Sequence, residues 1–161
     1  MDYEIDVKNL KRCAEISRQS REGGNTPFGA LLAGKDGSIL LEQPNVEITE
    51  GKCTGHAETQ VAERASQLYS KNFLGECTLY TTAEPCACVQ ERSTGQASDG
   101  WCTVCLKKIC LPIQGQILRI PPLICLAVRY LQGDRKKIEV VGPFPELVEE
   151  IAEVHKGYWN N

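Results

Sequence analysis

The spacing of apolar residues predicts a helix near the start of the chain. Between residues 3 and 21, Val7, Leu10, Ala14 and Ser17 share one face, and most of the charged side chains fall off it. A pair of glycines follows and ends the pattern. We therefore expect a surface helix with one buried face.

Two apolar runs around an Asp-Gly dipeptide predict a β-hairpin. Residues 28–33 and 38–42 flank Asp36 and Gly37, and Asp-Gly is a favoured hairpin turn. Further strands are predicted at residues 77–82 and 136–141.

Helical spacing returns at two later places. Residues 55–70 repeat apolar positions after a Thr-Gly start, and residues 145–159 form an amphipathic pattern near the end. The chain has 161 residues, of which 42% are hydrophobic, and no Pro/Gly/Ser-rich linker divides it. The order of elements predicts one α/β domain over residues 1–161.

Charge and cysteine content narrow the classes of function. A net charge of −3 and an isoelectric point near 5.5 provide no basic stripe, so nucleic acid is not the expected partner. The first residues lack a basic segment followed by an apolar one, and no apolar run approaches membrane-spanning length. We expect a cytoplasmic protein without a membrane span. Its nine cysteines then fit reduced thiols and metal ligands better than disulfides.

The segments Gly-His-Ala-Glu-Thr and Glu-Pro-Cys carry the chemistry. A catalytic zinc site leaves one coordination position for water and needs a carboxylate that moves protons without binding the metal. His56 can supply the imidazole and Glu58 the carboxylate. Residues two apart diverge in the middle of a helix, so this pair can act together only at a helix start. Alone, a histidine there would more commonly be a cap or a solvated side chain.

With these segments the chain resembles the zinc-dependent cytidine/deoxycytidylate deaminase superfamily, whose motif is H-x-E followed by P-C-x-x-C. The segments GNTPFGALL and LYTTAEPC are most similar to its guanine deaminase and nucleoside deaminase branch. The resemblance implies a three-layer α/β/α domain with a central mixed sheet, Zn²⁺ and a homodimer. It also implies that His56 and Cys86 bind zinc and that Glu58 is catalytic. In the same way, Asn45 would hydrogen-bond the base or ribose, and Phe28 would line the pocket.

Asn45 and Phe28 also have plain structural interpretations. An asparagine that follows a proline is ordinarily a turn residue, and a phenylalanine on an alternating strand is ordinarily part of the core.

Positions 87–131 depart from the family pattern. Val89 stands where the motif has its second cysteine, so Cys88 is the candidate third zinc ligand, and the polar run that follows has little to bury. A shift of the codons by one base permits a cysteine at position 89 and family-like segments further on, which suggests a compensated frameshift or a recording error. The alternative is a genuine insertion, in which Cys102 and Cys105 would form a separate zinc or redox pair.

The predicted function is zinc-dependent hydrolytic deamination of a purine base or nucleoside, guanine-like first. Within the enzyme class the alternative is adenosine deamination in tRNA. Outside it, the chain would be an impaired or non-catalytic zinc-binding homologue, which four protein ligands would indicate.

Overall fold

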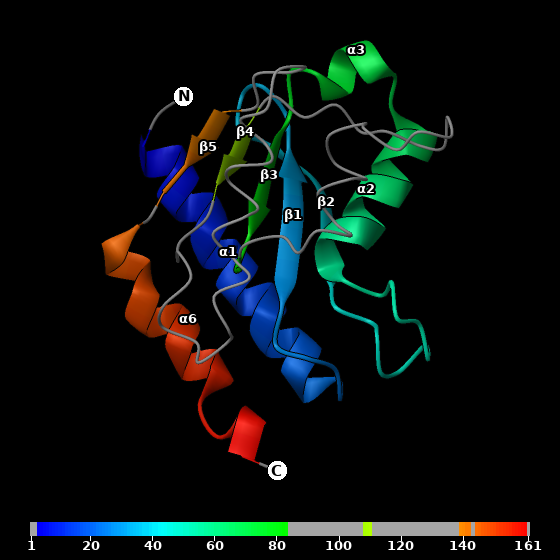
Figure 1. Ribbon diagram of the computed structural model, residues 1–161. Helices are drawn as coiled ribbons and strands as arrows, with labels where there is room; N and C mark the ends of the chain where they lie inside the picture. Colours follow the sequence, from blue (N-terminus) through cyan, green and yellow to red (C-terminus); the bar gives the residue numbers. More distant parts are fainter. Residues whose placement is uncertain (1–2, 84–107, 111–138, 143, 161) are drawn as a thin grey trace.

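The computed structural model describes residues 3–83, 108–110, 139–142 and 144–160 (Figure 1). The N-terminal half contains α1 (Tyr3–Glu22), β1 (Gly29–Ala33), β2 (Ile39–Pro44), α2 (Ala57–Leu68), α3 (Lys71–Leu74) and β3 (Thr78–Thr81). The remainder contains β4 (Lys108–Cys110), β5 (Glu139–Val141), the 3₁₀ turn η2 (Pro145–Leu147), α6 (Val148–His155) and the 3₁₀ turn η3 (Tyr158–Asn160).

The strands form one mixed sheet in the order β2-β1-β3-β4-β5. β1 pairs antiparallel with β2 and β3, whereas β3, β4 and β5 run parallel. The expected mixed sheet is confirmed. β4 was not predicted, because it lies in the segment whose pattern departs from the family.

Helices cover both faces of the sheet (Figure 1). Ala30 and Leu32 of β1 share a core with the α2 face, whereas Leu31 shares one with α1, η2 and α6. Successive residues of β1 therefore point into opposite cores, because side chains alternate between the two faces of a pleated strand. The α/β/α class predicted from the sequence is confirmed.

The first strand and α1 are in unusually close contact at one end. A Cβ atom at Gly29 would lie 2.7 Å from the Ser17 backbone nitrogen and 2.8 Å from the Cys13 carbonyl oxygen. The Ser17 hydroxyl also donates to the Pro27 carbonyl, at 2.6 Å. This contact fixes where β1 begins, which is also where the candidate site lies.

The predicted elements of the N-terminal half are present with shifted ends. α2 is shorter than predicted, because His56 before it and Tyr69 after it have extended backbones. The hairpin turn is longer than an Asp-Gly pair: the Gly34 N–H bonds to the Ser38 carbonyl at 2.9 Å, and Gly37 has φ of 83°. Within the described part of the chain, no helix is both long and apolar enough to cross a membrane.

Candidate active site

The candidate site begins where the loop after β2 meets the start of α2. The Val46 N–H donates to the Gly55 carbonyl at 2.9 Å. A Cβ atom on Gly55 would come within 2.6 Å of the Glu47 nitrogen, so only glycine fits here without movement of the loop. His56 follows as the N-cap residue of α2, with an extended backbone at φ −61° and ψ 139°. The histidine and Glu58 therefore lie at the helix start, as the sequence predicted.

Glu58 is a buried carboxyl group in the first turn of α2. Only 6% of its surface is exposed, and burial is the main reason that its pKa is raised above the ordinary value. The Thr81 hydroxyl at the end of β3 donates to its Oε1 at 2.5 Å. A buried carboxyl group whose pKa is raised by burial is a candidate catalytic acid or base.

Thr81 can serve both protonation states of Glu58. Its Oγ1 also lies 3.1 Å from the Ala83 carbonyl oxygen. The single hydroxyl proton can go to an ionised Glu58, or it can go to Ala83 while a protonated Glu58 donates to Thr81. The pair can therefore hold or release a proton without leaving a buried group unpaired.

Asn45 follows β2 and is a turn residue, as its position after a proline suggested. Its N–H donates to the Phe28 carbonyl at 3.1 Å, and its Oδ1 accepts from the Glu47 N–H at 2.8 Å. Only 1% of Asn45 is exposed. Since the turn engages Oδ1, a ligand would meet the Nδ2 donor.

Phe28 precedes β1 and packs against the end of the chain. Its ring centroid lies 5.2 Å from that of His155 and 6.2 Å from that of Trp159. Sequence analysis missed His155 and Trp159 as neighbours of this site, because nothing in the amphipathic pattern distinguishes them from other residues of a terminal helix.

The structure brings His56, Glu58, Asn45 and Phe28 to one end of the sheet, whereas Cys86 and Cys88 lie outside the described residues. The described part of the chain has no cluster of three or more metal-ligating side chains. Its cysteines are Cys13 and Cys77, both buried, and Cys53, which is exposed. Burial raises the pKa of Cys77 to about 11, which disfavours a thiolate there. His56 is half-buried and lies close to the buried Glu58. Its imidazole fits the role of one zinc ligand.

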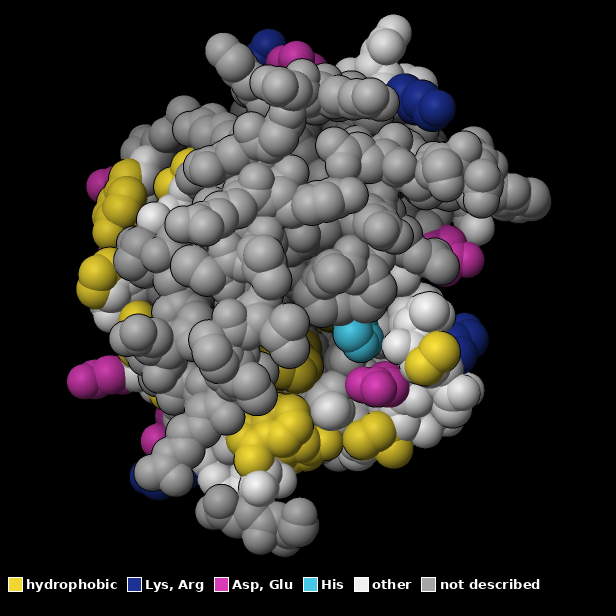
Figure 2. Space-filling model, viewed as in Figure 1, with side chains coloured by type: hydrophobic (Ala, Val, Ile, Leu, Met, Phe, Trp, Pro, Cys, Tyr) yellow, Lys and Arg dark blue, Asp and Glu magenta, His cyan; other side chains and the backbone are white. Residues whose placement is uncertain are grey.

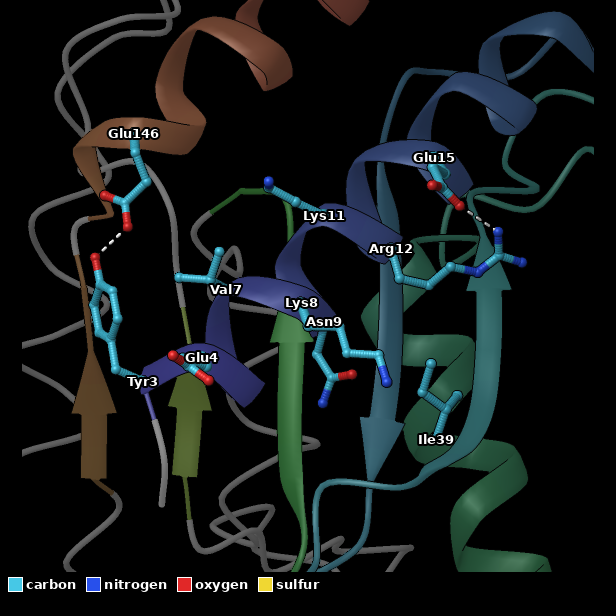
Figure 3. Close-up of a pocket in the computed structure, with 10 residues that line it drawn as sticks. All are labelled: Tyr3, Glu4, Val7, Lys8, Asn9, Lys11, Arg12, Glu15, Ile39 and Glu146. Atoms are coloured by element: carbon cyan, nitrogen blue, oxygen red, sulfur yellow. Dashed lines mark hydrogen bonds and ion pairs between the residues drawn. The ribbon is translucent and has the colours of Figure 1, made fainter.

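A separate groove lies on the outer surface of α1 (Figure 3). Tyr3 and Glu146 are hydrogen-bonded at one end of it, and Arg12 pairs with Glu15 at the other. Since α1 covers the sheet face opposite α2, this groove is distinct from the candidate site.

In the view of Figure 2, a histidine side chain is visible at the surface beside an acidic one, with hydrophobic side chains grouped nearby.

A buried carboxyl group beside a histidine at a helix start, on a three-layer mixed sheet, defines the class of zinc-dependent deaminases. The chain belongs to the cytidine and deoxycytidylate deaminase family: the model of that family's zinc-binding region matches residues 4–111. It is therefore a hydrolase that deaminates with Zn²⁺ as its cofactor.

Its relatives differ in substrate and in how much of the chain they match. A probable cytosine deaminase of Schizosaccharomyces pombe is 27% identical over 157 residues, which cover 98% of this chain and 94% of the relative. The guanine deaminase of Bacillus subtilis is 36% identical over 78 residues, 48% of this chain, and the match spans about half of that enzyme (49%). A solved tRNA:A34 deaminase shares the fold, with a TM-score of 0.66 and 20% identity over 92% of this chain and 99% of its own.

Proposed function

We propose that the protein hydrolytically deaminates a free nucleobase or nucleoside, guanine-like first. The observation that supports this most directly is the buried Glu58, which is two residues after His56 and is held by Thr81. The similarity to guanine deaminase, at 36% identity over 78 residues, supports guanine. Cytosine is the second candidate, because the relative that aligns along 98% of the chain is a probable cytosine deaminase.

In this proposal His56, Cys86 and Cys88 hold the metal. Zinc, when bound, activates a water molecule for attack on the ring carbon that bears the amine. Glu58 accepts the first proton of that water and delivers it to the ring nitrogen. It then accepts the second proton from the hydroxyl group newly bonded to the ring carbon and delivers it to the amine, which departs as ammonia. With Oε1 held by Thr81, we assign this proton transfer to Oε2. Asn45 orients the base through Nδ2, and Phe28 contacts its face.

The test is ammonia release by the zinc-loaded protein from guanine, guanosine, cytosine, cytidine and an adenosine-containing tRNA anticodon stem. We expect release from a free base or nucleoside and none from RNA. Glu58→Gln should abolish release while zinc content stays at the wild-type level, because the carboxyl group moves protons and does not hold the metal. Zinc loss in this variant, or turnover of RNA alone, would contradict the proposal.

The finer expectations on partners belong to the same proposal. We expect a cytoplasmic homodimer that acts on small molecules. Adenosine deamination in tRNA is the alternative, and the net charge of −3 does not favour it. A structural zinc site with four protein ligands would make the chain a non-catalytic homologue.

A further inference from the structure

His155, the last residue of α6, has a buried imidazole whose protonation pattern can be assigned. The Trp159 indole N–H lies 3.4 Å from its Nδ1, and an indole nitrogen can only donate, so Nδ1 is the acceptor. Burial and the positive charge of Arg21 lower the pKa of His155 to about 4. The neutral ring therefore carries its proton on Nε2.

The Nε2 atom of His155 is a buried donor without a partner. Only 3% of the residue is exposed, and no hydrogen bond to Nε2 is made in the described part of the chain. An unpaired buried donor is costly, so native proteins rarely keep one that has no use.

The surroundings of His155 connect it to the candidate active site. Its ring contacts Phe28, and the Phe28 carbonyl accepts the N–H of the buried Asn45. Phe28 immediately precedes β1, in which Ala30 pairs with Thr81, the residue that holds Glu58. The imidazole thus packs on Phe28 at the end of the sheet where Asn45, Thr81 and Glu58 lie.

We propose that the Nε2–H of His155 donates a hydrogen bond to an uncharged acceptor of the bound base, a ring nitrogen or a carbonyl oxygen, and so selects among bases. This inference rests on the proposed function. Trp159 is a positioning residue in the same arrangement, because its indole N–H fixes the histidine tautomer that presents the donor.

The experiment measures binding apart from turnover. Calorimetric titration of zinc-loaded Glu58→Gln protein would use guanine, 7-deazaguanine, which lacks the N7 acceptor, and 2-aminopurine, which lacks the carbonyl oxygen. Cytosine and 4-aminopyrimidine form the matching pyrimidine pair. Each ligand is titrated into proteins with His155, His155→Gln and His155→Phe.

For the base that binds, we expect His155→Phe to raise Kd by roughly 10-fold or more, and His155→Gln, which keeps an N–H donor, to raise it less. The analogue that lacks the contacted acceptor should bind weakly to the protein that retains His155. Its Kd should rise almost no further in His155→Phe. Trp159→Phe should weaken binding of the parent base to an intermediate degree. Tyr69→Phe, a matched aromatic control whose ring packs on Phe73, should change Kd by less than about 2-fold.

The outcomes separate the two proposals. If a base binds but His155→Phe weakens every ligand and analogue equally, His155 is structural and the inference is wrong. If no base or analogue binds to the zinc-loaded protein, the proposed function fails and the inference fails with it. In the enzyme that retains Glu58, an increase in KM with unchanged kcat on His155→Phe substitution would support base contact by His155.

Discussion

At the scale of single residues, the hydroxyl of Thr81 holds the Glu58 carboxyl group by a hydrogen bond. It is fully buried on β3 and contacts both the Glu58 carboxyl group and the Ala83 carbonyl. We expect Thr81→Val to lower kcat by roughly 10-fold or more with little change in KM, because the carboxyl group loses the hydrogen bond from the Thr81 hydroxyl. Steady-state kinetics would measure this. Thr78→Val removes another buried hydroxyl of β3, at the end away from Glu58, and should leave kcat nearly unchanged; equal effects would contradict the role given to Thr81.

Gly55 is the residue whose lack of a side chain permits the approach of the loop to α2. In Gly55→Ala, the new Cβ would press on the Glu47 backbone, at 2.6 Å from the nitrogen and 2.7 Å from Cα. We expect the free energy of unfolding to fall by about 1–3 kcal/mol and zinc affinity to fall as well, since His56 is the next residue. Chemical denaturation and a zinc competition assay would test this.

The control for that variant is Gly51→Ala. Gly51 has φ of 60°, and a Cβ atom added to it would have no other atom within 4 Å, so alanine there adds backbone strain without a clash. It should cost about 1 kcal/mol and leave zinc affinity unchanged. A loss of zinc affinity in both variants would show that the effect is general destabilisation.

At the scale of elements, α6 is joined to the site by its C-terminal end. Arg21 of α1 donates to the carbonyls of Val154 and Lys156, at 2.7 and 2.9 Å, which satisfies groups that a helix end leaves unpaired. The same arginine lies 5.9 Å from the centroid of the Tyr158 ring. The end of α6 is therefore held against α1, and with it His155 against Phe28.

This junction predicts how stability depends on pH. The pKa of His155 is lowered to about 4 by burial and by Arg21, whereas an unfolded histidine has the ordinary value of 6.5. Between these values the unfolded chain binds a proton that the native chain does not, so stability falls as pH falls from about 7 toward 4. We expect a loss of about 3 kcal/mol from this group, measured by urea denaturation at several pH values.

His155→Phe should flatten the part of that pH dependence that lies below pH 6.5. Carboxyl groups contribute in the same range, and the difference between the wild-type and variant curves isolates the histidine. Parallel curves would mean that His155 is not neutral in the folded protein, in conflict with its contacts to Phe28, Trp159 and Arg21.

At the scale of the whole molecule, the open question is how the central segment completes the zinc site. The S. pombe relative aligns over 157 residues with almost the full length of both chains, which supports a replaced segment over an inserted one. We therefore keep the compensated frameshift as our proposal for positions 87–131. It accounts for a family-like length together with a polar, cysteine-containing sequence that has Val89 in place of the motif's second cysteine.

Val89→Cys tests this proposal directly, because it restores a cysteine three positions after Cys86. We expect zinc affinity to rise by about 10-fold or more, since one thiolate ligand at the right helical spacing is regained. Zinc titration with a chelating indicator would measure it, and Cys53→Ser, at an exposed cysteine, serves as the control. Unchanged affinity in Val89→Cys together with zinc loss in Cys88→Ser would show that Cys88 already completes the site and that the segment is functional as written.

The amino-acid sequence by itself determined the elements with strong local patterns and the pair His56 and Glu58. Periodic burial depends only on which residues face the core, so the helix before residue 22, the hairpin and the terminal helix were predicted with small errors at their ends. The motif placed the histidine and the carboxyl group at a helix start because no other position lets them act together.

Only the tertiary structure decided which distant residues meet at the site. Thr81 reaches Glu58 because β3 pairs with β1 in a particular register, and His155 reaches Phe28 because α6 packs beside α1 and ends there. Neither contact leaves a periodic trace in the sequence, since each joins residues far apart along the chain through the geometry of the sheet. The burial that raises the pKa of Glu58 and lowers that of His155 arises in the same way, from packing by elements that the local sequence does not contain.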